Sequence, residues 1–71
     1  METPEIALKL ARTIKALRQK KGWTQEGTAE RIGMDLRYYQ RLESQKPYTI
    51  RIDTLERIAH AFHKKPADLL K

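Results

Sequence analysis

The chain has 71 residues, no cysteine and a net charge of +6, from 15 Lys and Arg against 9 Asp and Glu. A chain of this length builds one small domain with a thin core, so we expect a single domain over residues 1–71. The lack of cysteine excludes a disulfide framework and a thiolate metal site. The basic balance favours a polyanion as partner, although a basic surface also serves solubility.

The sequence shows no sign of a membrane or secretion segment. No apolar stretch approaches the length of a membrane span, and the first ten residues, METPEIALKL, lack the basic-then-apolar pattern of a signal peptide. We therefore expect a soluble, cytoplasmic protein with no membrane partner.

The first predicted helix begins after Thr3, a good N-cap, with Pro4 at its first position, where a missing N–H costs nothing. Gly22 ends this helix. Apolar residues recur at helical spacing along it, at Ile6, Leu10, Ile14 and Leu17. Trp23 follows in the connection and is expected to plug the core.

Residues 24–44 predict two helices joined by a tight turn, over residues 25–32 and 36–44. A side-chain oxygen stands at each N-cap, on Thr24 and Asp35. Ala29 has no bulk to obstruct a close helix crossing, and Gly33 can take a positive φ in the turn. Such a helix-turn-helix unit most often presents its second helix to the DNA major groove.

The remaining chain predicts a loop, QKPYTIRI, a fourth helix and a short final turn. The fourth helix carries an apolar face of Leu55, Ile58, Ala59 and Phe62. Pro66 starts the last turn, from which Leu69 and Leu70 fold back. No segment alternates long enough to predict a strand, so the fold class is all-α.

The outward face of the helix over residues 36–44 carries no acidic residue. Tyr39 and Leu42 point to the core, and the opposite face gathers Leu36, Arg37, Gln40, Arg41 and Ser44. Arginine can hold guanine with two hydrogen bonds, glutamine can pair with adenine, and leucine can pack on a thymine methyl. We interpret Leu36, Arg37, Gln40 and Arg41 as base-reading residues; the alternative is an ordinary solvated face.

Flanking residues are expected to bind DNA phosphates. Gln25 adds an amide to the unpaired N–H groups that begin the second helix. The chain after the third helix is rich in donors, and we assign phosphate contacts to Ser44, Lys46, Tyr48 and Arg51. As an alternative, Tyr48 and Arg51 pack over the core and point to water.

Arg18 and Glu43 are expected to pair. Each flanks the inner face of its helix, so a bidentate bridge between them would fix the angle of the third helix. The role of this pair is structural.

At this point the sequence resembles the Cro/repressor-type (lambda repressor-like, XRE) helix-turn-helix domains. The matching stretches are IKALRQKKGWTQ, AERIG, the RLE that closes the third helix, and DTLERIAHAF followed by PADLL. The resemblance implies a compact five-helix domain of a prokaryotic transcriptional regulator that binds operator DNA, usually as a dimer on a palindrome. It also implies that Gln25 touches the DNA backbone, that Leu36, Arg37, Gln40 and Arg41 read bases, and that Arg18 and Glu43 link helices.

Three departures from the family pattern bear on the structure. Gly27 and Thr28 stand where the family prefers a charged helix former and a leucine. A mid-helix glycine costs ~1 kcal/mol relative to alanine, so we expect a weaker second helix. Gln45 and Lys46 replace the common glycine-containing turn, and Tyr39 takes a core position generally filled by an aliphatic residue.

Two other classes of function compete with DNA binding. A protein-interaction module of the same fold would use an exposed surface of Leu8, Leu36 and Tyr38. An enzyme is not expected, because the only histidines, His60 and His63, have no nearby carboxylate on a matching face and make an incomplete zinc site. We expect no metal, no cofactor and no small-molecule ligand.

The partner is expected to be double-stranded operator DNA, with the protein at the nucleoid when bound. A homodimer is expected at least on DNA, and its candidate surface is the C-terminal region with His60, His63, Leu69 and Leu70. Two symmetric copies would place their reading helices about 34–36 Å apart. Alternatively, Leu69 and Leu70 are used by the domain's own core.

Overall fold

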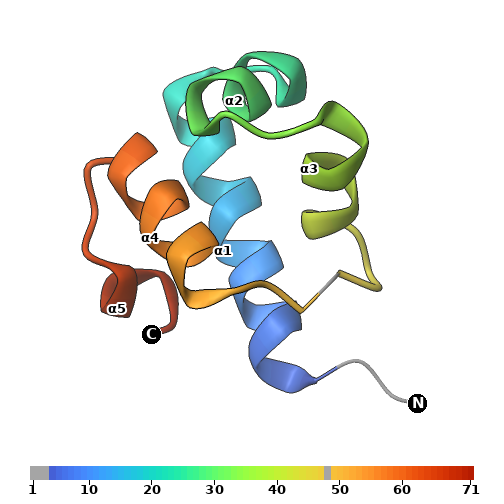
Figure 1. Cartoon of the computed structure of the whole chain (residues 1–71), viewed down its shortest axis with the longest axis vertical. Helices are drawn as coiled ribbons and strands as arrows, with labels where there is room; N and C mark the ends of the chain where they lie inside the picture. Colours follow the sequence, from blue (N-terminus) through green and yellow to red (C-terminus); the bar gives the residue numbers. More distant parts are fainter. Residues whose placement is uncertain (1–3, 48) are drawn as a thin grey trace.

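A computed structural model describes residues 4–47 and 49–71, and within them it contains five helices and no strand. The helices are α1 (Glu5–Lys21), α2 (Gln25–Ile32), α3 (Leu36–Leu42), α4 (Ile52–Ala61) and α5 (Pro66–Leu69). Figure 1 shows α1 running through the middle of the molecule, with α2 at its C-terminal end, α3 on one side, and α4 and α5 on the other. The all-α, five-helix expectation is confirmed.

One apolar cluster joins all five helices. Its buried members are Leu10, Ile14, Ala29, Ile32, Tyr39, Leu42, Ile58, Ala59, Phe62 and Leu69. Tyr39 is fully buried, as expected for a core position. Trp23 is only partly buried, and its ring stacks on that of Phe62 with centroids 5.4 Å apart, so it closes the edge of the core.

The ends of α1 and α3 differ from their predicted positions. Pro4 is the N-cap of α1 and not its first residue, and the predicted cap Thr3 lies outside the described residues. Gly22 ends α1 with φ +71°, as predicted. α3 ends at Leu42 and not at Ser44, because the Ser44 hydroxyl and N–H both donate to the Arg41 carbonyl.

The glycine in α2 is not in the middle of its helix, contrary to expectation. Thr24 is the N-cap and its Oγ1 accepts from the N–H of Gly27, at 2.9 Å, so Gly27 belongs to the first turn. Thr28 is fully buried, and its hydroxyl donates to the Thr24 carbonyl at 2.8 Å. Both unusual residues therefore serve the start of the helix.

The C-terminal segment folds back onto α1 through α5, as predicted for residues 66–70. Leu69 is fully buried and Leu70 is partly buried. No helix in the described ranges combines the length and the apolar character needed to cross a bilayer.

Candidate nucleic-acid interface

Side-chain caps and a left-handed glycine set the geometry of α2 and α3. Asp35 caps α3 by accepting from the N–H groups of Arg37, at 2.9 Å, and Tyr38, at 3.3 Å. Gly33 has φ +83° and donates its N–H to the Ala29 carbonyl at 2.9 Å, which ends α2 and turns the chain toward α3. The turn predicted at Gly33 is the one observed.

Arg57, on α4, holds this turn through two hydrogen bonds, and we call this contact the Arg57 clamp. Its Nη2 donates to the carbonyl oxygens of Ile32, at 3.0 Å, and Gly33, at 2.6 Å. A cation at the carbonyl end of α2 also interacts favourably with the helix dipole. Sequence reasoning missed this contact, because 24 residues separate Arg57 from Gly33 and no local pattern links them.

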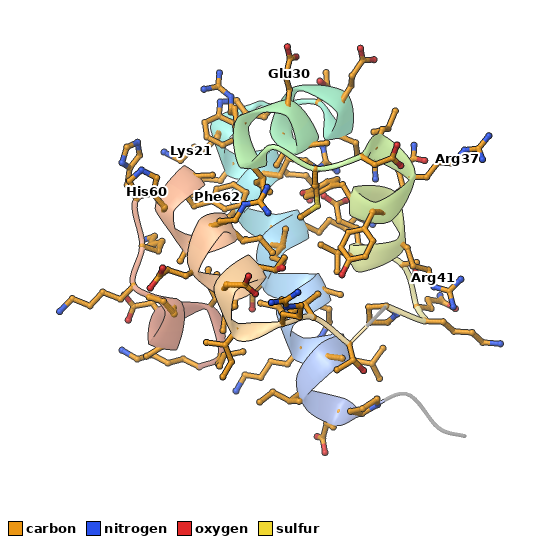
Figure 2. All side chains as sticks on the ribbon, viewed as in Figure 1. Lys21, Glu30, Arg37, Arg41, His60 and Phe62 are labelled. Atoms are coloured by element: carbon orange, nitrogen blue, oxygen red, sulfur yellow. The ribbon has the colours of Figure 1, made fainter. Side chains whose placement is uncertain are left out.

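The exposed side of α3 carries Arg37, Gln40 and Arg41. Figure 2 shows Arg37 and Arg41 extending from α3 into solvent on the same edge of the molecule. No hydrogen bond or ion pair holds the Arg37 side chain within the described residues. Arg41, in contrast, donates through Nε to the Lys46 carbonyl, so that the loop after α3 is tied to α3 itself.

Two other residues of the predicted DNA face are less exposed. Leu36 is partly buried and packs against the core, although it lies in the first turn of α3. Ser44 follows the helix, and its Oγ accepts from the Lys46 N–H at 3.2 Å. The structure therefore uses both side chains within the protein.

A buried carboxylate, that of Glu43, anchors α3 to the rest of the molecule. Its side chain is 3% exposed and accepts from Arg18 twice, from Nε at 2.6 Å and from Nη2 at 3.1 Å. It also accepts from the Tyr39 hydroxyl and from Gln25 Nε2, the latter at 3.2 Å. Arg18 in addition donates Nη1 to the Trp23 carbonyl at 2.9 Å. Four donor groups thus compensate the burial of one negative charge.

These contacts shift the pKa values of the groups involved. Burial raises the pKa of the Glu43 carboxyl, but the hydrogen bonds from Arg18, Tyr39 and Gln25 outweigh burial and hold that pKa below its ordinary value. The pKa of the Tyr39 phenol is raised, first by burial and then by its hydrogen bond to Glu43. Glu43 also raises the pKa of Arg18 through their hydrogen bonds. At neutral pH Glu43 and Arg18 therefore stay charged, and the Tyr39 phenol stays protonated and able to donate.

Gln25 connects this buried network to the exposed face of α3. Its amide nitrogen donates to Glu43, and its amide oxygen lies 3.4 Å from Nε2 of Gln40. The pairing of Gln25 with two α3-side residues was not predicted, because sequence spacing gives a face of a helix but not the reach of a side chain between helices.

The loop after α3 carries exposed cations at Lys46 and Arg51. Arg51, the N-cap of α4, forms an exposed ion pair with Asp53 of that helix at 3.2 Å. Tyr48, which was expected to bind phosphate, lies outside the described residues.

The side chains that were expected to form an exposed surface for a protein partner are less exposed than predicted. Leu8, Leu36 and Tyr38 are each partly buried rather than exposed. His60 and His63 are exposed, and no cluster of three metal-binding side chains occurs in residues 4–47 and 49–71.

The family follows from a comparison with known proteins. A model of the helix-turn-helix family HTH_3 matches residues 14–69, which is most of the chain. The chain belongs to the XRE-type helix-turn-helix family. The resemblance noted in the sequence is thereby confirmed, and the matched residues span the turn at Gly33, the exposed face of α3 and the Arg18–Glu43 pair.

A solved structure has the same arrangement of helices. The crystal structure of a hypothetical transcription factor, NHTF, from Neisseria superposes with a TM-score of 0.85 at 30% sequence identity. The match covers 100% of this chain and 84% of that chain. No curated protein matches the sequence.

Proposed function

We propose that this protein is a sequence-specific DNA-binding transcriptional regulator that reads the major groove with α3. The observation that carries the proposal is the exposed face of α3, where Arg37, Gln40 and Arg41 stand together on a helix without any acidic residue. A helix of this kind, held at a fixed angle by a buried ion pair, suits direct recognition of base edges. In this proposal Leu36, which is partly buried in the first turn of α3, contacts a thymine methyl with the part of its side chain that remains exposed.

Phosphate contacts flank this face in the proposal. Lys46 and Arg51 are exposed cations in the loop after α3, and Tyr48 and Ser44 belong to the same stretch. At the other flank, α2 begins with unpaired backbone N–H groups next to Gln25. The Gln25 amide has two N–H bonds and donates one to Glu43, so the second remains for a phosphate oxygen. These contacts would set the register and supply the salt-dependent part of the affinity.

We further propose that two copies bind a palindromic operator. One α3 of seven residues reads only a few base pairs, and a symmetric pair doubles the contacted sequence. The family and a neighbour described as a hypothetical transcription factor support regulation by occupancy of DNA. Regulation by occupancy requires no catalytic group and no cofactor.

Selection from a random duplex pool tests this proposal, with the binding of the selected duplex measured over a series of salt concentrations. We expect a palindrome whose half-sites repeat after about one helical turn, ~34–36 Å, and an affinity that falls steeply with salt. If no sequence is enriched and binding stays weak and nearly independent of salt, the protein is not a DNA-binding regulator.

A further inference from the structure

A hollow of about 600 Å³ lies where the end of α1 meets the end of α4. Its floor consists of the less exposed side chains, those of Leu17, Trp23 and Phe62. Its rim consists of exposed side chains, those of Lys20, Lys21, His63 and Lys64. Figure 2 shows Lys21 on the side of the molecule that carries His60, whereas Arg37 and Arg41 extend from the opposite side. The hollow is therefore separate from the exposed face of α3.

The rim of the hollow is positively charged and has no negative counterpart. It carries the ammonium groups of Lys20, Lys21 and Lys64, and no carboxylate lines the hollow. None of these three groups forms an ion pair within residues 4–47 and 49–71. Cations around one concavity repel each other, and an anion placed between them relieves that repulsion. A compact group with several negative charges therefore complements this hollow.

His63 keeps a side chain where the backbone favours glycine. Its φ is +57°, and its N–H donates to the His60 carbonyl at 3.0 Å as the chain leaves α4. The residues in the same left-handed conformation after α1 and α2 are glycines, Gly22 and Gly33. A side chain is strained in this conformation, so its presence indicates a use for the imidazole, which has a ring N–H to donate whether it is neutral or charged.

The floor of the hollow is fixed by contacts within the protein. The Trp23 ring stacks on Phe62, and the guanidinium carbon of Arg31 lies 4.1 Å from the centroid of the Trp23 ring. Nζ of Lys21 lies 5.4 Å from the same centroid, so the ring also holds one cation of the rim in place. A site whose parts are already held loses little conformational freedom when a ligand binds.

We infer that this hollow binds a small molecule that carries two or three linked phosphate groups, with Lys20, His63 and Lys64 in contact with the phosphate oxygens. Linked phosphates bring several charges and many acceptor oxygens in one compact group, and the volume of the hollow is in the usual range of small-molecule sites. An acidic peptide fits less well, because it carries only one charge on each side chain. The inference does not depend on the proposed function.

Calorimetric titration of the full chain with inorganic pyrophosphate and triphosphate tests the inference, with sulfate as the reference anion at the same ionic strength. Trp23 is the only tryptophan of the chain and lines the hollow, so its fluorescence reports occupancy independently. A nucleoside diphosphate is titrated in parallel. Tighter binding of the nucleotide than of pyrophosphate would assign the apolar floor to a base, and equal binding would assign the site to the phosphates alone; both results support the inference.

We expect triphosphate to bind about tenfold or more tightly than sulfate and to change the emission of Trp23. Lys20→Ala and Lys64→Ala should each weaken triphosphate binding by about three- to tenfold. Lys9→Ala removes the same charge from an exposed site near the beginning of α1 and should bind as the wild type does. If Lys9→Ala loses as much affinity as Lys20→Ala, only the net charge attracts the anion, and the inference is overturned. Equal binding of sulfate and triphosphate also overturns it.

His63→Gly separates ligand binding from folding. Glycine relieves the backbone strain, so this variant should be at least as stable as the wild type in urea denaturation, yet bind triphosphate about threefold or more weakly. A purely structural role of His63 would change stability and not affinity. Full affinity in His63→Gly would overturn the part that the imidazole has in the site.

Duplex DNA is the competing source of phosphates, and a displacement titration distinguishes it. We expect triphosphate to stay bound when a random duplex is added. If the duplex displaces triphosphate, and if Lys20→Ala and Lys64→Ala weaken duplex binding as much as triphosphate binding, the hollow is a nucleic-acid contact and the inference is overturned. If the protein binds triphosphate but no duplex, this inference stands and only the proposed function is overturned.

Discussion

At the scale of single residues, the most constrained group is the Glu43 carboxylate. It accepts from Arg18, Tyr39 and Gln25, and it lies just after the last turn of α3. The pairing of Arg18 with Glu43 could be anticipated from the sequence, because both residues flank the inner faces of their helices. The Tyr39 hydroxyl and the Gln25 amide could not, because a helical wheel gives direction but not the length and tilt of side chains.

Removing the phenol hydroxyl tests how much this network stabilises the fold. Tyr39→Phe keeps the buried ring but takes one donor from an ionised carboxylate, so we expect the free energy of unfolding to fall by about 1.5–3 kcal/mol. Glu43→Gln leaves the Arg18 guanidinium without its counter-charge and should cost more, about 3–5 kcal/mol. Urea denaturation measures both, and a larger loss for Tyr39→Phe than for Glu43→Gln would contradict this order.

Arg37 is the residue whose loss should separate specific from non-specific binding. A bidentate contact with a guanine discriminates by ~1–3 kcal/mol, so Arg37→Ala should weaken binding to the selected duplex by that amount more than binding to random DNA. Lys64→Ala, which removes one positive charge from an exposed site near the end of α4, is the control. Equal losses on both duplexes would assign Arg37 to a phosphate.

Lys46 is expected to act on every sequence alike. Its side chain is exposed, whereas its backbone carbonyl accepts from Arg41, so Lys46→Ala removes the charge and retains the loop contact. The slope of log affinity against log salt should decrease by about one, with specificity unchanged. Lys64→Ala again serves for comparison, and an unaltered slope in Lys46→Ala would remove this residue from the interface.

At the scale of elements, caps and glycines were the strongest signals in the sequence. Thr24, Asp35 and Gly33 each occupy the position that the sequence predicted. The end of α3 was predicted two residues too far, because the Ser44 hydroxyl competes for the Arg41 carbonyl and a propensity argument does not include that contact. Gly27 was misplaced for a related reason: its N–H is bound by the cap of its own helix.

The two left-handed glycines provide a matched comparison. Alanine at either position pays ~1–2 kcal/mol for the left-handed conformation. A Cβ at Gly22 meets nothing within 4 Å, but at Gly33 it comes within 3.1 Å of Arg57 Nη2. Gly33→Ala should therefore cost roughly 1 kcal/mol more than Gly22→Ala in thermal or urea unfolding, because the Arg57 clamp must shift.

DNA binding should separate the same two variants. Only Gly33→Ala disturbs the connection between α2 and α3, so it alone should weaken binding to the selected duplex. If the two variants have the same free energy of unfolding, the Arg57 side chain moves aside without a loss of stability, and its contact does not stabilise the turn.

At the scale of the whole molecule, the fold followed from the sequence more completely than the surface did. Helical spacing and caps identify the core, since burial repeats with the period of the helix. Helical spacing did not predict that Ile6 and Ile52 are exposed. Ile6 is the first residue of the apolar stripe of α1, and the later residues of that stripe are the ones that reach the core. Ile52 precedes the apolar stripe of α4. Surfaces that bind partners carry the same residue types as cores, so periodicity does not distinguish them.

The pH dependence of stability should reflect the same buried network at both ends of the scale. The pKa of Glu43 is lower in the folded state, so its contribution is complete above the unfolded value, about 4.3, and is lost as pH falls through the folded pKa. The pKa of Tyr39 is raised, so its contribution is complete below about 10 and is lost as pH rises beyond that value.

Urea denaturation at a series of pH values measures these two limbs. Glu43→Gln should flatten the acid limb, and Tyr39→Phe should flatten the alkaline limb. An acid limb that is as steep in Glu43→Gln as in the wild type would show that other carboxyls determine it.

The Gln25 amide contacts both Glu43 and Gln40, so not every residue on the exposed face of α3 can be exchanged independently. Arg37 projects from α3 without a side-chain partner in the described chain, so it can be exchanged alone to retarget the protein. Exchange of Gln40 removes the neighbour of Gln25, and exchange of Arg41 releases the loop toward α4. If α3 were replaced by the helix of another protein, the new helix would have to restore the contacts that Gln40 makes with Gln25 and Arg41 with Lys46. A change of operator preference is therefore simplest to engineer at position 37.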